Sequence, residues 1–357
     1  MFSKSLTWAL VIPTYKREHI LLRCLRLAAV QTRPPKEIIV VDASPDSEKT
    51  RDLVTHEFGE LYPKIKLIYV KANRASSTTQ RNQGIKLSSA DVLFLIDDDS
   101  LMYPDCAEEV MKIYEADTNA IIKGISPIAV PEPPDIQDLA GQLEQQQGAI
   151  AVKPRQTFLR RFIKFILKTD ETYFLPYDRD YPVHELPQEI SNFNVGSIQV
   201  MAGYTMTFRR EILQKELFNE VLDRYAAGED QDLSYRVSRY GPIINAVNAR
   251  LCHLEISGGR LSTYLVTVLA ALNPAVLHQF YSTDLKLSHK NWIKILYRRL
   301  LIYLLKDISQ QKWDLPRTRG VIYARSQLNL IFSKSPKDLL EWYPKFQEEI
   351  IDSDRVS

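Results

Sequence analysis

The feature that most constrains the fold is an alternation of short apolar runs with amphipathic stretches over roughly the first 130 residues. Two of the runs, EIIVVD and VLFLID, are apolar throughout rather than at every second position. Strands that are covered on both faces in a parallel sheet have this continuous pattern. The sequence therefore predicts an α/β fold that begins βαβαβαβ, with a mostly parallel sheet flanked by helices.

Polar residues follow three of these runs at the points where strands are expected to end. In open α/β sheets, ligands bind beyond the carboxyl ends of the strands. We therefore expect these residues to converge on one ligand-facing edge. They are Pro13, Thr14 and Tyr15 after the first run, Asp42 after the second, and Asp97, Asp98 and Asp99 after the fourth.

Composition narrows the class of protein. Hydrophobic residues make up 45% and charged residues 25% of the 357 residues, which is ordinary globular usage and excludes disordered, collagenous and disulfide-scaffold chains. The three cysteines are widely spaced without a CxxC pair, so neither a disulfide framework nor a cysteine-based zinc site is predicted. A net charge of +2 excludes a generally basic nucleic-acid binder, so we expect no nucleic-acid partner.

The regular pattern breaks once and ends in a helical tail. Residues 127–191 contain PEPPD, QLEQQQG and RQTFLRRFIKFILK, which we interpret as an insertion carrying a basic amphipathic helix. We expect a main domain at 1–260, with halves 1–126 and 192–260 on either side of this insertion. Residues 261–357 form the predicted helical C-terminal extension.

Two apolar stretches could be mistaken for membrane or targeting segments. The opening MFSKSLTWALVIPTYK has too short an apolar run for a signal peptide, so we expect no secretion. Residues 261–277 fall short of the ~20 residues that a spanning helix needs, and they contain Asn273 and Pro274.

The triplet Asp97-Asp98-Asp99 is the first candidate for chemistry. No GxGxxG follows the first strand and no GxxxxGK[ST] occurs. If the ligand carries phosphate groups, their negative charge must therefore be neutralised by other residues. Two carboxylates that flank one position can share Mg²⁺ or Mn²⁺, and the ion can also bind a diphosphate. A solvated acidic turn is the alternative. After a buried strand it is less favoured, because three clustered carboxylates repel one another unless a cation offsets them.

The second acidic cluster contains Glu229, Asp230 and Asp232. Gly228 predicts a turn, and the following LSYRVSRY has helical spacing, so the first two carboxylates are expected at a helix N-terminus. The helix dipole keeps a carboxylate there ionised. Ordinary helix capping explains the cluster when it is taken alone; beside a DxD motif, a carboxylate here could also accept a proton from an attacking hydroxyl.

Taken together, five segments resemble a family 2 glycosyltransferase with the GT-A fold, over residues 7–260 without the insertion. The resemblance implies a Rossmann-like sheet, Mn²⁺ or Mg²⁺, and inverting transfer of a sugar from a nucleotide-sugar donor. It also implies a glycan or lipid-linked acceptor, as in cell-surface polysaccharide or glycolipid synthesis. The segments are VIPTYKRE, IIVVDASPD, NRASSTTQRNQGIKLSSADVLFLIDDD, VMAGYTMTFRREIL and GEDQDLSYRVSRYG.

The resemblance also assigns roles to the two halves and to individual positions. It implies that residues 1–126 bind the nucleotide and that residues 192–260 supply the acceptor side and the catalytic base. Asp230 is the expected catalytic base, with Glu229 in support. The expected metal ligands are Asp97, Asp99 and His253. The expected nucleotide-binding residues are Pro13, Thr14, Tyr15, Asp42, Arg74, Arg81, Asn82, Asp97 and Asp98. The chain departs from the family pattern at Phe218-Asn219-Glu220, where relatives often have a phenylalanine-aspartate-glutamate triplet, and FYSTDLKLSHKN lacks the arginine-asparagine pair frequent in close relatives.

Two other classes of protein remain open on the sequence. A nucleotidyltransferase on a related α/β sheet also uses acidic metal sites, although its usual glycine-rich, basic entry loop is missing. A noncatalytic membrane-associated scaffold is the other alternative, and the intact Asp97, Asp99 and Asp230 count against it.

Two basic segments predict contact with an anionic membrane. Residues 155–168 contain five Lys or Arg and no acid, and residues 284–325 contain ten Lys or Arg against three Asp. Both segments interleave the charges with aromatic residues, as interfacial helices do. We therefore expect a cytoplasmic protein that lies peripherally at the inner face of the cell membrane. Core packing plus solvated charge is the alternative interpretation. The aromatic residues of the second segment include Trp292, Tyr297, Tyr303 and Trp313.

Overall fold

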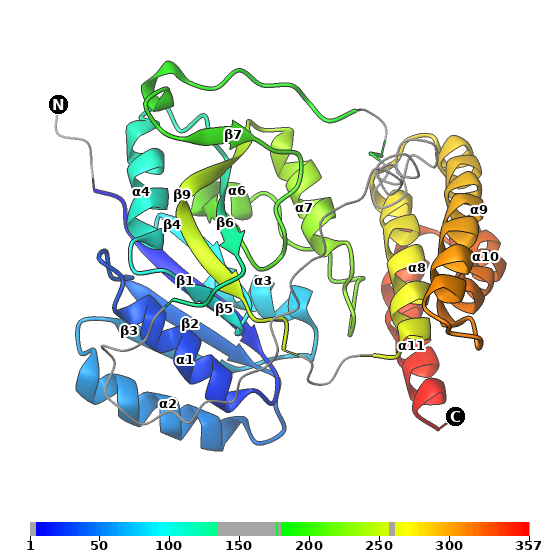
Figure 1. Cartoon of the computed structure of the whole chain (residues 1–357), viewed down its shortest axis with the longest axis horizontal. Coiled ribbons are helices and arrows are strands. Elements are labelled where there is room, and N and C mark those ends of the chain that lie inside the picture. The colour runs from blue at the N-terminus through cyan, green and yellow to red at the C-terminus, as the bar shows by residue number, and fades with distance from the viewer. Residues whose placement is uncertain (1–4, 135–175, 178–179, 257–260, 357) are drawn as a thin grey trace. The chain divides into compact units, whose positions relative to one another are not determined.

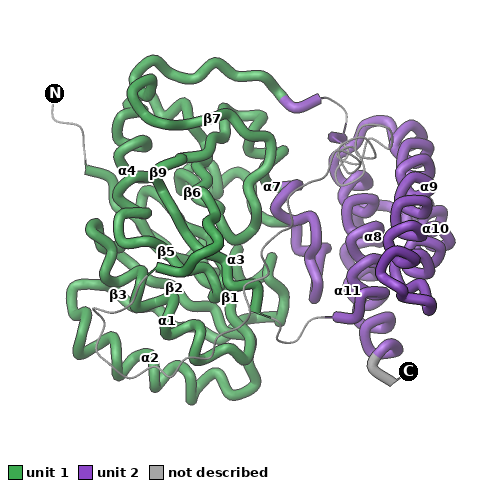
Figure 2. Tube along the Cα trace, viewed as in Figure 1, with its two compact units in different colours: residues 1–152, 182–218, 233–257 green, residues 153–181, 219–232, 258–357 purple. Residues whose placement is uncertain are grey.

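The computed structural model describes residues 5–134, 176–177, 180–256 and 261–356. The chain divides into two compact units (Figure 2). The first comprises residues 1–152, 182–218 and 233–257, and the second comprises residues 153–181, 219–232 and 258–357. The predicted basic helix at 155–168 lies outside the described residues.

The first unit is built on a nine-stranded sheet with the order β3-β2-β1-β4-β8-β6-β9-β5, and β7 pairs with β9 (Figure 1). The strands β3, β2, β1 and β4 run parallel, as the sequence predicts. Beyond them β8 runs antiparallel to both β4 and β6, so the second half of the sheet is mixed. The strands are β1 Trp8–Thr14, β2 Glu37–Asp42, β3 Lys66–Lys71, β4 Val92–Leu95, β5 Ser100–Met102, β6 Gly124–Val130, β7 Val195–Ser197, β8 Met206–Arg209 and β9 Ile243–His253.

Both faces of the central strands are covered, which explains their continuous apolar sequences. In β1, Leu10 packs into one hydrophobic cluster with the helices α1, α2 and α4, while Val11 packs into a second cluster with α3, α6 and α7. Successive strand residues point to opposite faces, so each face needs its own apolar set. The helices are α1 Glu18–Ala29, α2 Ser47–Leu61, α3 Ser77–Leu87, α4 Cys106–Ala116, α6 Arg210–Leu213 and α7 Glu229–Ser238.

In its described residues, the second unit contains four long helices, which are α8 Thr263–Tyr281, α9 Leu285–Ser309, α10 Pro316–Ser333 and α11 Pro336–Val356. Helix α10 packs against both α8 and α9, and α11 packs against α8. Asn273 is the polar residue that interrupts the most apolar stretch of the sequence, residues 261–277. Its side chain is fully buried, donates to the carbonyls of Tyr225 and Ala227, and accepts from the hydroxyl of Tyr343 and the amide of Gln347.

Two sequence expectations about membrane contact can be compared with these helices. Among the helices that the structure describes, none is long and apolar enough to cross a bilayer. Trp292, which we grouped with the interfacial aromatic residues, is fully buried and packs edge-on against His278. The expectation is wrong for this tryptophan, because its side chain lies in the interior of the second unit.

The close packing of α3 on the sheet depends on Gly84. A Cβ atom at this position would lie 2.4 Å from Cγ1 of Val11 in β1, so any larger residue must displace the helix or the strand. Gly84 thus sets the distance between α3 and β1.

We predict that Gly84→Ala destabilises the protein by about 1–3 kcal/mol through overpacking. Gly59 on α2 is the matched control, because a Cβ there meets no atom within 4 Å. Gly59→Ala should instead stabilise by about 0.5–1 kcal/mol, since alanine loses less entropy in a helix. Thermal unfolding followed by circular dichroism measures both. Equal melting temperatures for the two variants would contradict the close-approach argument.

Candidate active site

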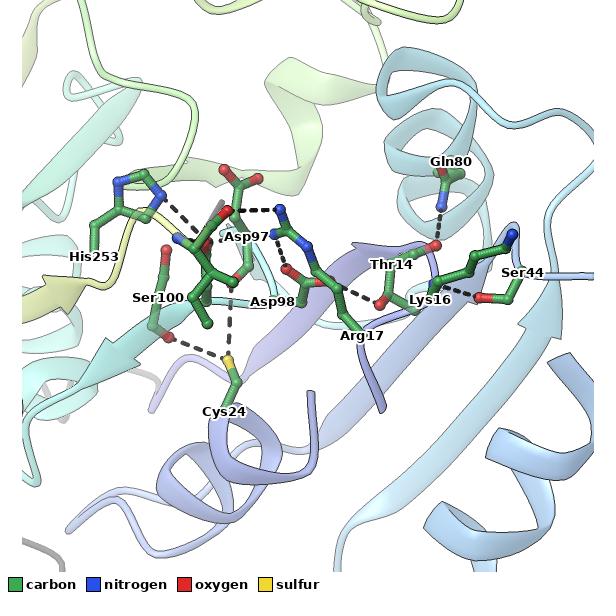
Figure 3. A network of polar contacts seen from close by, with 12 residues as sticks. Thr14, Lys16, Arg17, Cys24, Ser44, Gln80, Asp97, Asp98, Ser100 and His253 are labelled. Carbon is green, nitrogen blue, oxygen red and sulfur yellow. Dashed lines mark hydrogen bonds and ion pairs between the residues drawn. The ribbon is translucent and has the colours of Figure 1, made fainter. Parts of the chain in front are cut away.

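The pairing of two short strands brings the acidic triplet to a histidine. Asp97, Asp98 and Asp99 follow the buried strand β4, and β5 begins immediately afterwards at Ser100. In the antiparallel β5–β9 pair, Ser100 lies opposite His253, and the Leu254 amide donates to the carbonyl oxygen of Asp99 at 3.0 Å. The end of β9 therefore lies beside the end of β4, and the predicted candidates for a metal site meet there (Figure 3).

Asp97, Asp99 and His253 have the geometry of a possible metal site. One ligand atom of each lies within 4.8 Å of the others. The Nδ1 atom of His253 is buried without a hydrogen-bond partner, and the ring stacks on Tyr204 with centroids 4.0 Å apart. Two carboxylates and an imidazole form a donor set that suits a divalent cation such as Mn²⁺ or Mg²⁺. These residues therefore fit the metal that the sequence predicts.

Two arginines offset the repulsion within the acidic triplet. Nη1 of Arg17 lies 2.9 Å from Oδ1 of Asp98 and 3.5 Å from Oδ2 of Asp99. Nη2 of Arg81, which is almost fully buried, lies 2.7 Å from Oδ1 of Asp97. Protein cations thus stabilise the three carboxylates, and they also place positive charge where a diphosphate would need it.

Sequence reasoning found Arg81 but missed Arg17. Arg17 follows the turn after β1, where Lys16 adopts a left-handed conformation with φ of 54° and its amide donates to the hydroxyl of Ser44 at 2.7 Å. A left-handed non-glycine residue at a strand end is uncommon and marks a constrained turn. This turn leads the chain into α1 with Arg17 at its N-cap, beside the triplet.

The surroundings shift the pKa values of the site residues in different directions. Burial would raise the pKa of Asp99, but hydrogen bonding and charge from His253, together with the Ile256 amide and Arg17, hold it below its usual value. Burial lowers the pKa of His253, and the contact with Asp99 outweighs this and raises it. Asp98 differs, because burial outweighs the contributions of Arg17 and Thr14 and raises its pKa to about 6. A metal bound by both His253 and Asp99 would replace the contact between these two side chains.

Several predicted nucleotide-binding residues make internal contacts. Asp42 is fully buried and accepts from the amide and hydroxyl of Ser44 and from the hydroxyl of Tyr69. The side chain of Asn82 donates to the carbonyl of Phe218 and accepts from its amide. These contacts hold the loops around the strand ends, and the direct roles that we assigned to Asp42 and Asn82 stay predictions.

The other predicted residues lie at the end of β1 and before α3. The hydroxyl of Thr14 donates to Oδ2 of Asp98 at 2.8 Å, which links the first strand to the triplet. Pro13 lies within β1, Tyr15 is exposed just beyond it, and Arg74 is exposed in the loop before α3. Gln80, which sequence reasoning missed, donates to the carbonyls of Thr14 and Val41 and so joins the ends of β1 and β2 (Figure 3).

The second acidic cluster opens α7, as predicted. Gly228 has φ of 95°, a conformation that side chains disfavour, and Glu229 and Asp230 form the first turn of the helix. Asp232 accepts a hydrogen bond from the hydroxyl of Tyr177 at 2.5 Å. Residues 219–232 belong to the second compact unit and residues 233–257 to the first. The catalytic role of Asp230 therefore stays a prediction.

Comparison with known proteins supports the resemblance. Residues 9–139 match the model of glycosyl transferase family 2. An uncharacterized glycosyltransferase from Haemophilus influenzae is 28% identical over 111 residues, which cover 31% of this chain and 35% of that protein, so the match spans about a third of the relative's length. Among solved structures, the mannosyltransferase PcManGT from Pyrobaculum calidifontis, in complex with GDP-Man and Mn²⁺, superimposes with a TM-score of 0.51 at 13% identity, covering 91% of this chain and 88% of that one.

These comparisons confirm the resemblance to family 2 glycosyltransferases that the five sequence segments indicate. They also confirm the predicted fold class, an α/β fold of GT-A type with a helical C-terminal extension. The likeness to PcManGT concerns the fold, because the sequence identity is low.

We predict that Asp99→Ala weakens Mn²⁺ binding by at least about 10- to 100-fold, because it removes a charged member of a small donor set. Electron paramagnetic resonance of added Mn²⁺ measures free and bound ion. Asp91→Ala is the control, since Asp91 bonds to Thr7 at the start of the sheet, away from the triplet. Unchanged Mn²⁺ affinity in Asp99→Ala would remove this residue from the metal site.

Proposed function

We propose that this chain is an inverting glycosyltransferase that moves a sugar from a nucleotide-sugar donor to a glycan or lipid-linked acceptor. The observation that carries the proposal is the cluster of Asp97, Asp99 and His253, whose two aspartates lie within the segment 9–139 that matches the family model. The complex of PcManGT with GDP-Man and Mn²⁺ supports the donor class and the metal.

In this proposal, Asp97, Asp99 and His253 hold Mn²⁺ or Mg²⁺. Such an ion, when bound, supplies Lewis-acid stabilisation of the charge on the departing nucleoside diphosphate. Arg17 pairs with Asp98 and Arg81 pairs with Asp97, and both add positive charge at the strand ends. The ends of β1 and β2 are held in place by Thr14, Gln80 and the turn at Lys16. The donor therefore binds to a pre-organised surface.

We assign the base to Asp230, with Glu229 in support. A carboxylate in the first turn of a helix is favoured in its ionised form, which a proton acceptor requires. Direct attack by one acceptor hydroxyl opposite one leaving group inverts the configuration at the anomeric carbon. The acceptor that fits this chemistry is a hydroxyl of a glycan or lipid-linked glycan, as in cell-surface polysaccharide or glycolipid synthesis.

The proposal predicts that wild-type protein with Mn²⁺ releases free nucleoside diphosphate from a member of a nucleotide-sugar panel in the presence of glycan acceptors. Asp230→Asn keeps the shape but loses the base, so transfer should fall by roughly 10²- to 10⁴-fold while donor affinity stays the same. Chromatography of the nucleotides and calorimetry of donor binding measure the two effects. Release of pyrophosphate would indicate a nucleotidyltransferase instead, and no turnover of any donor would favour a scaffold.

We further propose peripheral contact with an anionic membrane at the inner face of the cell membrane. The exposed face of α9 supports this proposal. Large apolar side chains recur on it at helical spacing, and the lysines of the helix's first half lie on the same sector. The one acid in the helix, Asp307, is buried and paired with Arg317. The exposed apolar residues are Tyr297, Leu301, Leu305 and Ile308, and the exposed lysines are Lys286, Lys290 and Lys294.

We predict that Leu301→Glu/Leu305→Glu lowers binding to phosphatidylcholine–phosphatidylglycerol vesicles by at least about 10-fold, because each buried leucine contributes roughly 1.5–3 kcal/mol. Wild-type binding should also weaken with salt. Leu53→Glu/Leu61→Glu on α2 is the control, since both leucines are comparably exposed on the first unit. Vesicle co-sedimentation measures binding, and equal binding by all three proteins would refute the role of α9.

A further inference from the structure

The helical unit contains a cavity of about 730 Å³ that the proposed transfer chemistry does not use. Its walls come from the start of α8, the turn between α9 and α10, the start of α10 and the last turns of α11. All of these segments belong to the second compact unit. Its volume lies within the range of small-molecule sites, roughly 300–1,000 Å³.

The cavity combines an apolar base with aromatic walls. Leu265 and Val268 of α8 are buried and line it, and Leu265 belongs to a small hydrophobic cluster with Leu269 and Ile351. Tyr264 and Tyr323 face the same space, with ring centroids 6.2 Å apart and planes inclined by 54°. Two tilted aromatic rings provide apolar faces on which the C–H surfaces of a flat, polar molecule can pack.

The charged residues that line the cavity sum to no net charge. Lys312 and Arg319 supply two cations, and Asp314 and Asp354 supply two carboxylates. A nucleotide, a diphosphate or an anionic lipid headgroup would meet carboxylates as well as cations, so a strongly charged ligand gains little there. A ligand with many hydroxyl groups can donate to the carboxylates and accept from the cations at the same time. The lining therefore favours a neutral, hydroxyl-rich ligand.

The turn that carries Lys312 and Asp314 is held in a fixed shape. The residues on either side of it, Gln311 and Leu315, both have left-handed backbone conformations with φ of 54° and 48°. The buried carboxylate of Asp307 accepts from the backbone amides of Arg317 and Thr318, which fixes the start of α10 after the turn. A pre-organised wall of this kind lowers the entropy that a ligand must remove on binding.

A glycine sets the spacing of the two helices that carry the tyrosines. A Cβ atom at Gly320 of α10 would lie 2.9 Å from the carbonyl oxygen of Tyr264 on α8. This close approach places the guanidinium carbon of Arg319 at 5.8 Å from the centre of the Tyr264 ring. The arrangement of the Tyr264 ring and the Arg319 guanidinium thus depends on the absence of a side chain at Gly320.

We propose that this cavity binds a neutral saccharide segment of the acceptor glycan, a proposal that rests on the proposed glycosyltransferase function. The tyrosine rings pack against the sugar C–H faces, Arg319 and Lys312 donate to hydroxyl oxygens, and Asp314 and Asp354 accept from hydroxyl groups. The helical unit then contributes acceptor recognition through its own site.

Saturation-transfer difference NMR with maltotriose, cellotriose, chitotriose and mannotriose tests the proposal, with trigalacturonic acid as an anionic comparison. At least one neutral trisaccharide should bind to wild-type protein. Its affinity should fall at least about 10-fold in Arg319→Ala and in Asp314→Asn, because each variant loses a hydrogen bond between a charged group and a sugar hydroxyl. Lys334→Ala is the matched control, since Lys334 lies over the ring of Trp342, which does not line the cavity.

Three results would overturn the proposal: no neutral trisaccharide binds to wild-type protein, the Arg319 and Asp314 variants bind like wild type, or only trigalacturonic acid binds. Melting temperatures of the variants check that they fold. Chromatography of the nucleotides released from the donor panel with Mn²⁺ separates this proposal from the proposed function. Trisaccharide binding without turnover of any donor would refute the glycosyltransferase and keep the saccharide site, whereas sugar transfer without trisaccharide binding would do the reverse.

Discussion

Electrostatic repulsion among three adjacent carboxylates is the constraint on which the candidate site depends. Asp97, Asp98 and Asp99 follow a buried strand, where low solvent access strengthens their repulsion. Three side chains offset this repulsion: Arg17 from the turn before α1, Arg81 from α3 and His253 from the end of β9. Elements far apart in the sequence therefore meet at one edge of the sheet, where they offset the repulsion within the triplet.

The same edge is supported by contacts that carry no charge. Gln80 joins the last residues of β1 and β2, and the thiol of Cys24 on α1 lies 3.1 Å from the carbonyl oxygen of Ser100. Burial raises the pKa of this thiol, so it remains protonated and acts as a packing group. Helices on both faces of the sheet thus hold the loops that carry the acidic residues, and the site needs little rearrangement to receive a cation.

Much of the first unit follows from its sequence, because continuous apolar runs of strand length have few alternatives to a covered parallel sheet. The ends of β1, β2 and β4 and the start of α7 were predictable for that reason. Arg17 was not, since its role depends on the left-handed conformation of Lys16, which a lysine seldom signals. The buried position of Trp292 also escaped prediction, because the exposed Lys290 and Lys294 lie two residues to either side of it and the periodicity of that helix is weak in sequence. The internal contacts of Asp42 and Asn82 depend on Tyr69 and Phe218, whose proximity only the fold establishes.

The pairing of Ser100 with His253 has a consequence for how such chains can vary in length. Side chains alternate between the two faces of a strand, so adding or removing one residue within β9 would turn His253 to the opposite face. The pairing of β6 with β9 already shifts register between Pro127 and Ile128, where β9 contains the extra residues 247–249 upstream of the point where His253 is fixed. Homologues that keep the histidine should therefore confine insertions and deletions to positions outside residues 250–253, and a single-residue gap inside this segment should coincide with loss of the histidine.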